Sequence, residues 1–283
     1  MDSVRKLLRV PFIEKALSAF PKRPDSLPGK IVPGNYLYSK PSIRSKTIDG
    51  ITMEFDLSNY VDHYIYFNFI DNSLDKLYSY AKPGTVVFDI GTNIGYVALK
   101  LAKEVGPTGK VYGFEPDADN FKKAQHNISD LNPWAKNLII DNSGFGDKKG
   151  QFKLYAVDEG NNGMNQIRND LSEGTRYSVI NIEVLDDYIA ERKISPPGLM
   201  KIDTEGYEMN IIKGGVKTIK EHKPVLFIEI DENNLKLQNN SARELVSFIK
   251  ELKYTIIHTG TGKEVLTSDD FTNCHFDGLC LPQ

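Results

Sequence analysis

The stretch Val86–Gly95, with the sequence VVFDIGTNIG, is the feature that most constrains how this chain can fold. Apolar residues with β propensity, interrupted only by Asp89, end in a turn that contains glycine, and an apolar helical pattern follows over Tyr96–Ala102. Gly91 and Gly95 can adopt backbone angles closed to other residues, and the free N–H groups at the helix start face the same space. The stretch therefore predicts a strand, a tight loop and a helix, with a small-molecule site at the loop.

A second strand is predicted at Lys110–Phe114, and Glu115 follows it, about twenty residues beyond the loop. An acid at the end of this strand typically binds ribose hydroxyls, so the two strand ends together predict a nucleoside pocket. A dinucleotide site has the pattern G-x-G-x-x-G, with a glycine where this chain has Asn93. The loop has the pattern D-x-G-x-N-x-G instead, which disfavours a dinucleotide.

That loop pattern resembles motif I of the class I methyltransferases that use S-adenosylmethionine (SAM). Three further motifs resemble one subset of the class, the FkbM-type methyltransferases: LMKIDTEG at Leu199–Gly206 with YEMNIIKG after it, FEP at Phe114–Pro116 and NNGMN at Asn161–Asn165. The motifs occur in family order and cover roughly Tyr80 to the C-terminus. The resemblance implies SAM as the cofactor. It also implies a Rossmann-like, doubly wound α/β sheet of seven strands, mostly parallel with a C-terminal antiparallel strand.

Composition limits the classes of partner. The 283 residues are 40% hydrophobic and 26% charged, and their net charge of -3 provides no basic surface for a nucleic acid, so we expect no such partner. No run approaches the roughly 18 apolar residues of a membrane span, and no secretory signal pattern is present. We therefore expect a cytoplasmic protein without a transmembrane segment. We expect the two cysteines, Cys274 and Cys280, to be reduced thiols rather than a disulfide or a metal site.

We divide the chain into an N-terminal extension, residues 1–80, and a class I methyltransferase domain, residues 81–283. Ser3–Phe20 has the pattern of a basic amphipathic helix broken near Pro11. Such a segment can bind a membrane surface or a partner, although packing across the domain or a dimer mate is the commoner role. A homodimer formed through this extension is therefore one prediction.

The rest of the extension contains a connection, a hairpin and an aromatic run. Pro21–Pro41 is rich in proline and glycine, which predicts an irregular connection without persistent helices, and Ile43–Leu57 predicts a hairpin around Asp49-Gly50. Tyr60–Asp71 is unusually aromatic, and its side chains could form a lid that stacks on adenine or a sugar, although packing is the commoner role. The candidate lid residues are Tyr60, Asp62, His63 and Tyr66.

The remaining strands of the sheet are predicted at Leu138–Ile140, Leu199–Ile202, Val225–Ile230, Tyr254–His258 and His275–Leu281. Two further strands, Gln151–Val157 and Ser178–Val184, flank the polar segment Asp158–Arg176. That segment is too long for a plain connection, and an acceptor-binding loop and a disordered loop explain it equally well.

The resemblance places the cofactor at the ends of neighbouring strands. Asp89 and the loop would face the methionine end of SAM, and Glu115 would accept two hydrogen bonds from the ribose diol. Asn142 and Ser143, after the third strand, could contact adenine or form an ordinary turn. The predicted cofactor-binding residues are Asp89, Gly91, Thr92, Asn93, Gly95, Glu115, Pro116, Asn142, Ser143 and Asp203.

Methyl transfer is an in-line displacement, so the protein mainly has to hold donor and acceptor in line. A protonated hydroxyl acceptor is a poor nucleophile, and a positioned base would assist it. Asp203, at the end of a strand, is the first candidate for the base, and Glu205 is the second. The next helix is predicted to begin at Thr204 or Glu205, and an acid at a helix N-terminus would explain Glu205 equally well.

Other groups are less constrained. Glu229 also lies near a strand end, whereas the positions of His258 and His63 are poorly determined by the pattern. Asp203, Glu205 and Glu229 could hold Mg²⁺, but their spacing is not diagnostic, so we predict no metal.

The sequence thus predicts SAM-dependent methyl transfer to a hydroxyl group of a small molecule or glycan, such as a sugar or natural product. Three alternatives are N-methylation, an NAD-dependent oxidoreductase and a non-catalytic binding module with the SAM fold. The oxidoreductase shares the strand, the loop and the acid, but Asn93 replaces the glycine that it requires.

Overall fold

This computed structural model describes residues 2–156, 160–168 and 175–283, and the chain divides into two compact units. The first unit comprises Met1–Asp71 and Ala156–Asn165, and the second comprises Asn72–Tyr155 and Gln166–Gln283. The helix α5 (Asn72–Tyr80), which the sequence analysis assigns to the N-terminal extension, belongs to the second unit and contacts α6 there.

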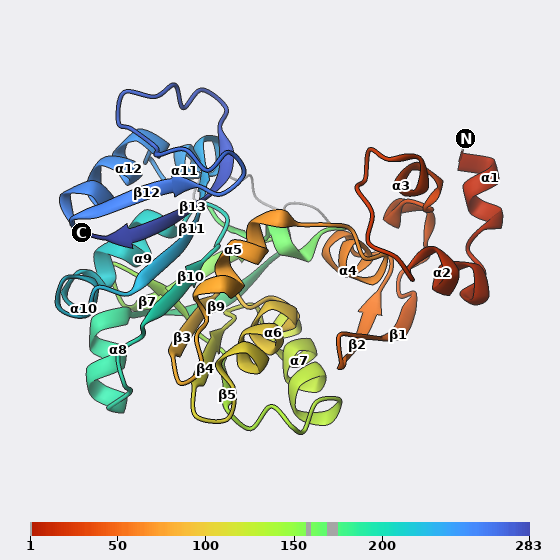
Figure 1. The fold of residues 1–283 in the computed structure, drawn as a ribbon, viewed down its shortest axis with the longest axis horizontal. Coiled ribbons are helices and arrows are strands. Elements are labelled where there is room, and N and C mark those ends of the chain that lie inside the picture. The colour runs from red at the N-terminus through yellow and green to blue at the C-terminus, as the bar shows by residue number, and fades with distance from the viewer. Residues whose placement is uncertain (1, 157–159, 169–174) are drawn as a thin grey trace. The chain divides into compact units, whose positions relative to one another are not determined.

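The second unit is built on a seven-stranded sheet with the order β12-β13-β11-β10-β3-β4-β5 (Figure 1). The strands β11, β10, β3, β4 and β5 run parallel, whereas β13 pairs antiparallel with both β11 and β12. Their bounds are β3 Val86–Ile90, β4 Lys110–Phe114, β5 Leu138–Asp141, β10 Leu199–Ile202, β11 Val225–Asp231, β12 Tyr254–His258 and β13 His275–Pro282. The predicted fold class is confirmed.

Helices cover both faces of this sheet, which is why its central strands are continuous apolar runs. Alternate strand residues such as Phe88 and Met200 pack in one cluster with side chains of α8, α9, α10 and α12. The intervening residues, among them Val87 and Leu199, are also buried and point to the opposite face, and α6 contacts β3 and β4. The bounds are α6 Tyr96–Val105, α7 Ala118–Gln125, α8 Leu185–Arg192, α9 Glu208–Gly214, α10 Val216–His222, α11 Glu232–Leu237 and α12 Ala242–Glu251.

A smaller sheet lies in the second unit, and the sequence analysis does not predict it as a sheet. Its order is β6-β9-β7-β8, and β7 pairs antiparallel with β9 around the buried side chains Leu154, Ile180 and Ile182. The bounds are β6 Gly144–Gly146, β7 Gly150–Tyr155, β8 Gln166–Ile167 and β9 Tyr177–Val184. The two strands predicted here are therefore present. The segment Asp158–Arg176 between them lies partly outside the described residues, and its described part includes a short 3-10 helix, Asn162–Met164.

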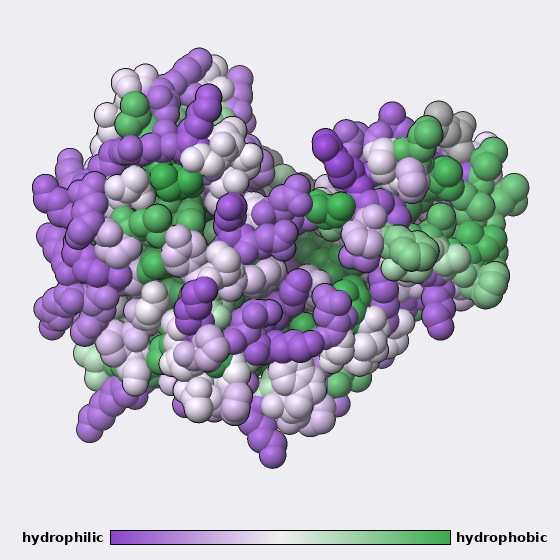
Figure 2. Space-filling view, viewed as in Figure 1, coloured by the Kyte–Doolittle hydropathy of each residue, from purple (hydrophilic) through white to green (hydrophobic). Residues whose placement is uncertain are grey.

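The first unit begins with α1 (Asp2–Leu7) and α2 (Pro11–Leu17), so the predicted break near Pro11 is confirmed. The predicted hairpin is formed by β1 (Ile43–Ile48) and β2 (Ile51–Asp56), and its turn residues have positive φ angles. Large apolar side chains are exposed on this unit, where Figure 2 shows green surface: Val4, Leu7, Phe12, Phe20 and Leu27. A homodimer formed through the N-terminal extension stays a prediction.

The prediction that helices do not persist over Pro21–Pro41 is wrong. The helix α3 (Leu27–Ile31) and a 3-10 helix, Asn35–Leu37, lie within it. Ser26 caps α3, because its hydroxyl oxygen accepts a hydrogen bond from the N–H of Gly29 at 3.2 Å. A proline occupies the first turn of α3, where the backbone N–H that proline lacks would have no hydrogen-bond partner within the helix.

The helix α4 (Tyr60–Tyr66) carries the candidate lid residues, of which Asp62, His63 and Tyr66 are buried within the first unit. Asp62 Oδ2 accepts a hydrogen bond from the Asp56 N–H at 2.6 Å, and His63 Nε2 donates to the Pro33 carbonyl at 2.6 Å. Burial lowers the pKa of His63 to about 4. These contacts favour the packing role, and the lid stays a prediction.

Within the part of the chain that the structure describes, no helix combines the length and the apolar character needed to cross a bilayer.

Candidate functional site

The loop after β3 is fastened to the acid at the end of β4. The N–H of Asn93 donates to Glu115 Oε2 at 2.8 Å, and the N–H of Asp117 donates to Oε1 at 3.0 Å. Gly91, Asn93 and Gly95 all have positive φ angles, of 86°, 52° and 89°, which wrap the loop tightly before α6. Glu115 is only 6% exposed, and burial raises its pKa to about 7. The two strand ends that the sequence analysis joins are thus joined in the structure.

Gly91 brings the loop into contact with the end of β10. A Cβ atom added to Gly91 would lie 1.9 Å from the carbonyl oxygen of Asp203, and the N–H of Asp203 donates to the Ile90 carbonyl at 3.1 Å. A larger residue at position 91 would therefore push the ends of β3 and β10 apart. A ligand that contacts both strand ends would then lose some of these contacts.

We expect the substitution Gly91→Ala to destabilise the protein by about 2–4 kcal/mol in urea unfolding, because a strained φ angle and a backbone clash add together. Gly262→Ala is the matched control, since Gly262 also has a positive φ, of 70°, but an added Cβ meets nothing within 4 Å. It should lose only the conformational part, roughly 1–2 kcal/mol. Equal losses in the two variants would contradict the close approach to β10.

A buried ion pair lies beneath this loop. Lys201 Nζ lies 3.4 Å from Asp89 Oδ1 and 3.2 Å from Asp203 Oδ2, and it donates to the Gly91 carbonyl at 3.2 Å. Asp89 is 0% exposed, and burial raises its pKa although the charge of Lys201 opposes the rise. Burial alone would lower the pKa of Lys201, but the charges of Asp203 and Asp89 outweigh it and raise that pKa.

Lys201, which was not predicted as a site residue, is the partner of Asp89 in the structure. A buried carboxylate needs a partner, which the sequence alone attributes to a ligand amine or to a buried cluster of N–H groups. The structure supplies it from the neighbouring strand, while Thr92 donates its hydroxyl to Asp89 Oδ2 at 3.2 Å. Contact between Asp89 and SAM stays a prediction.

The third strand end has its own network. Asn142 donates through its amide to the carbonyls of Glu115 and Pro116, at 2.8 and 3.1 Å, and the Ser143 hydroxyl donates to Asp141 Oδ1 at 2.8 Å. Asn142 is exposed and Ser143 is buried. These bonds are those of an ordered turn beside Glu115, and adenine contact by either side chain stays a prediction.

The helix after β10 begins later than predicted. Glu205 has a φ angle of 56° and Gly206 one of 106°, so neither is helical, and α9 begins at Glu208. Glu208 Oε1 accepts hydrogen bonds from the N–H groups of Thr204 and Gly206, at 2.9 and 3.2 Å. The prediction that Thr204 or Glu205 begins the helix is therefore wrong, because the glycine turns the chain first. It follows that Glu205 is not an acid of the first helical turn.

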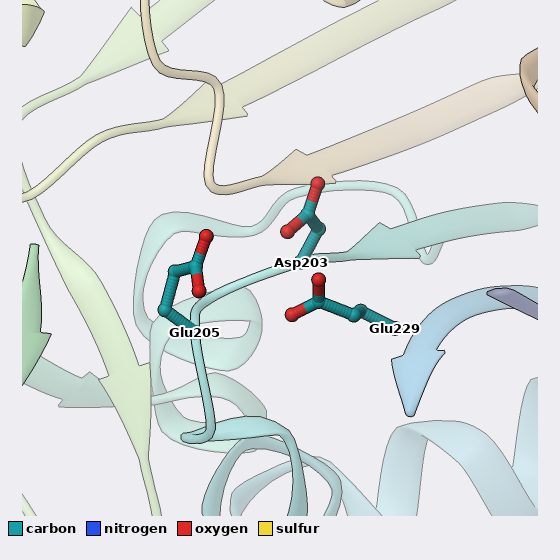
Figure 3. Close-up of side chains that lie close together, drawn as sticks. All are labelled: Asp203, Glu205 and Glu229. Atoms are coloured by element: carbon teal, nitrogen blue, oxygen red, sulfur yellow. The ribbon is translucent and has the colours of Figure 1, made fainter. Parts of the chain in front are cut away.

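Three carboxylates converge at the ends of β10 and β11. Asp203, Glu205 and Glu229 each offer an oxygen, and these atoms all lie within 4.8 Å of one another (Figure 3). Asn234 donates to Glu205 Oε2 at 2.8 Å, and burial, followed by the charge of Asp203, raises the pKa of Glu205 to about 8. Glu229 is 8% exposed, and burial raises its pKa well above the usual range. The structure thus brings together the two predicted catalytic residues and the third candidate acid.

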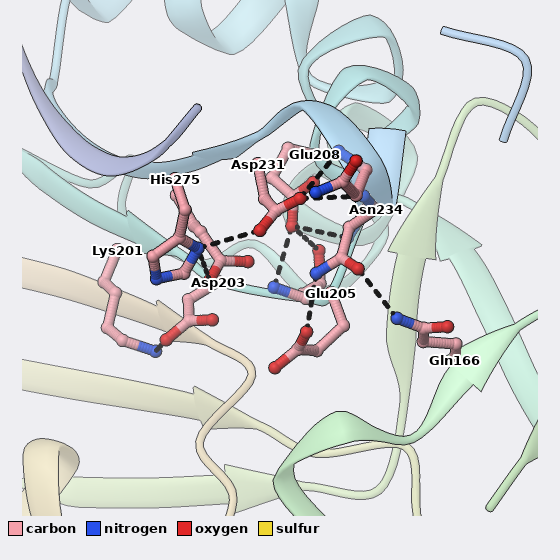
Figure 4. Close-up of polar contacts among 12 residues, drawn as sticks. Gln166, Lys201, Asp203, Glu205, Glu208, Asp231, Asn234 and His275 are labelled. Atoms are coloured by element: carbon pink, nitrogen blue, oxygen red, sulfur yellow. Dashed lines mark hydrogen bonds and ion pairs between the residues drawn. The ribbon is translucent and has the colours of Figure 1, made fainter. Parts of the chain in front are cut away.

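One histidine that the sequence analysis did not single out lies beside this cluster. His275 Nδ1 lies 2.9 Å from Asp231 Oδ2 and 3.8 Å from Glu229 Oε1 (Figure 4). His275 opens β13 and pairs with Asp231 across the antiparallel ladder, a register that the sequence pattern does not determine. Of the two histidines considered there, His258 stacks on Phe276 at 4.5 Å between ring centroids, and His63 belongs to the first unit.

These residues place carboxylates at the ends of strands on both sides of β3. Glu115 lies at the end of β4, where it accepts the N–H of Asn93, and half-exposed Asp203 lies at the end of β10, on the other side of β3. The side chain of Asp203 is 41% exposed, so it can reach a ligand while Lys201 holds it.

Known proteins resemble this chain over part of its length. Hexuronic acid methyltransferase AglP of Haloferax volcanii is 26% identical over 136 residues, which are 47% of this chain and 51% of that protein. The 2-O-methyltransferase NoeI of Sinorhizobium fredii is 24% identical over 167 residues, which are 54% of this chain and 66% of that protein. A solved methyltransferase FkbM from Methylobacillus flagellatus KT is 18% identical, with a TM-score of 0.42, over 77% of this chain and 52% of that one.

The matches therefore span between about half and two thirds of the relatives' own lengths. The family described as the Methyltransferase FkbM domain matches residues 89–256, which is more than half of the chain and runs from Asp89 in β3 into β12. By this match, the chain belongs to the FkbM methyltransferase family.

Proposed function

We propose that this chain is a SAM-dependent O-methyltransferase whose acceptor is a hydroxyl group of a sugar, a glycan or a related natural product. The observation that carries the proposal is the loop of β3 bonded to Glu115 at one strand end, beside Asp203 at the next, in a chain of a methyltransferase family. The names of two relatives, a hexuronic acid methyltransferase and a 2-O-methyltransferase, support a sugar hydroxyl as the acceptor.

The residues at these strand ends are of the types that can hold SAM. Each carboxylate oxygen of Glu115 accepts one backbone N–H and keeps a second lone pair for a ribose hydroxyl. The acids of the site complement the positive charges of the sulfonium and the amine. Bound SAM would supply an electrophilic methyl group, and the loop of Gly91, Asn93 and Gly95 would hold its methionine end.

On the acceptor side, Asp203 takes the proton of the hydroxyl group. Its carboxylate is oriented by Lys201 through Oδ2, so the side chain is positioned without being fully removed from solvent. Lys201 also pairs with the buried Asp89, so its positive charge is shared between the two aspartates and does not neutralise Asp203 completely. Glu205 is the second candidate for the same role.

Titration with S-adenosylhomocysteine and with NAD by isothermal calorimetry tests the cofactor. We expect the first to bind and the second not to, and the reverse would favour the oxidoreductase. Turnover of labelled SAM against a panel of sugars and amines then separates O-methylation from N-methylation. A protein that binds S-adenosylhomocysteine but transfers to no acceptor would favour a non-catalytic module. The cytoplasmic location expected from the sequence is part of this proposal.

The affinity for S-adenosylhomocysteine should depend on the protonation of Glu115. Because its pKa is raised to about 7, Glu115 is ionised above that pH, and only the ionised form accepts both ribose hydrogen bonds. We expect calorimetry to show an affinity about tenfold weaker at pH 6 than at pH 8.

The variant Glu115→Gln is the control for this dependence. It cannot ionise, so its affinity should vary little between the two pH values and should be at least about tenfold weaker than wild type at pH 8. A variant that keeps the pH dependence of the wild type would assign the titration to another group and would refute the contact with ribose.

A further inference from the structure

We infer that Asp203, Glu205 and Glu229 bind one divalent cation of the class that prefers oxygen ligands, Mg²⁺ or Mn²⁺. The role of the ion rests on the proposed function, because the carboxylates lie where the acceptor of a methyltransferase would bind. The binding of the ion is a separate property and is tested separately below.

The spacing of the three acids suits such an ion. One oxygen from each lies within 4.8 Å of the others, and the three side chains point toward one another from the ends of β10 and β11 (Figure 3). Mg²⁺ holds its ligands at about 2.0–2.1 Å, so opposite ligands lie up to about 4.2 Å apart. Small side-chain rotations would therefore bring the three oxygens onto one ion.

Glu229 provides the second, independent observation. Glu229 is only 8% exposed, and its Oε2 atom is inaccessible to solvent. This atom nevertheless has no hydrogen-bond partner in the described part of the chain. Buried carboxylate oxygens are normally satisfied, because an unpaired one loses its hydration without compensation. A cation in front of this oxygen would satisfy it.

The surroundings of the three carboxylates contain more negative than positive charges. Burial is the largest cause of the raised pKa of Glu229, and nearby negative charges raise this pKa further. These charges belong to Asp203, Glu205, Glu208 and Asp277. Lys201 reaches Asp203, but it is shared with Asp89, and the nitrogen of His275 lies nearer to Asp231 than to Glu229. Glu205 is bonded to the neutral amide of Asn234 (Figure 4). Among the described residues, no lysine or arginine pairs with Glu205 or Glu229, and His275 near Glu229 is positively charged only when protonated.

An ion held here would have a use in the proposed reaction. Mg²⁺ seldom binds through protein ligands alone and keeps several positions for water or substrate oxygens. A sugar with neighbouring hydroxyl groups offers two such oxygens, so the ion would select and orient an acceptor of that kind. The half-exposed side chain of Asp203 would lie between the ion and the solvent.

The test is titration of the full chain with MnCl₂ in metal-free buffer, with free Mn²⁺ followed by electron paramagnetic resonance. We expect one Mn²⁺ per chain, displaced by Mg²⁺. The variants Glu229→Gln and Glu205→Gln should weaken binding at least tenfold, and thermal unfolding should show that both remain folded. Glu221→Gln is the matched control, because Glu221 is exposed on α10 and undergoes the same chemical change.

A wild-type chain that binds no stoichiometric Mn²⁺, or a Glu229→Gln variant that binds it as tightly as Glu221→Gln, overturns the inference. S-adenosylhomocysteine affinity, measured in the same metal-free buffer, separates this failure from failure of the proposed function. A chain that binds S-adenosylhomocysteine but not Mn²⁺ would support the proposed function and overturn the inferred ion site. A chain that binds Mn²⁺ but not S-adenosylhomocysteine would support the ion site and contradict the proposed function.

Discussion

Replacing Lys201 with methionine is expected to destabilise the folded protein by about 3–5 kcal/mol, the cost of removing one partner from a buried ion pair. The side chain of Lys201 is 4% exposed, and it lies within 3.4 Å of Asp89, which is completely buried. Methionine fills a similar volume, so the loss would come from the carboxylate of Asp89 left without its cation. Urea unfolding followed by circular dichroism measures the change.

Two further variants identify the cause. The double variant Asp89→Asn with Lys201→Met should recover much of the lost stability, because it removes the orphaned charge together with its partner. Lys213→Met, on the exposed side of α9, should change the stability by less than about 0.5 kcal/mol. If the double variant is no more stable than Lys201→Met, packing rather than charge explains the effect.

The fold of the second unit was predictable because its signals are local. β3 is a short run of apolar, β-forming residues, Gly91 and Gly95 interrupt the pattern, and α6 follows with helical spacing. The same reasoning finds β4 in this unit and the hairpin of β1 and β2 in the first unit. The order of the strands was not predicted, since no local pattern determines which strand ends become neighbours.

What the sequence analysis missed depends on contacts between distant segments. Lys201 faces Asp89 only because β10 pairs with β3 in the register that aligns these two residues. In the sequence, Lys201 is merely a polar residue within a motif. His275 is similar, because its place beside Asp231 follows from the antiparallel pairing of β13 with β11.

The late start of α9 has a local cause that was present in the sequence. Gly206 interrupts the segment, and the positive φ angles of Glu205 and Gly206 keep both out of the helix. The predicted helix start at Thr204 or Glu205 is therefore too early, because Gly206 reverses the chain before the helix begins. As a result Glu205 faces Asp203 and Glu229 instead of the helix N-terminus.

Substitution of Asp203 by asparagine is expected to lower the turnover number by roughly 10²–10⁴-fold, the contribution of a positioned general base. Asparagine keeps the shape of the side chain but cannot take a proton. Since the cofactor would be held mainly by the β3 loop and Glu115, the affinity for S-adenosylhomocysteine should change by less than about twofold. Single-turnover kinetics with a responsive acceptor and calorimetry measure the two quantities on the same sample.

The separation of the two effects decides the role of Asp203. Asp187→Asn, an exposed aspartate of α8, is the matched control and should alter neither turnover nor affinity. Equal losses of turnover and affinity in Asp203→Asn would make the residue part of the cofactor site. Unchanged turnover would assign the role of base to Glu205. This residue lies in the same cluster, has a pKa raised to about 8 and accepts a hydrogen bond from Asn234. A loss confined to turnover would place Asp203 on the acceptor side, as the base or as a ligand of the inferred ion.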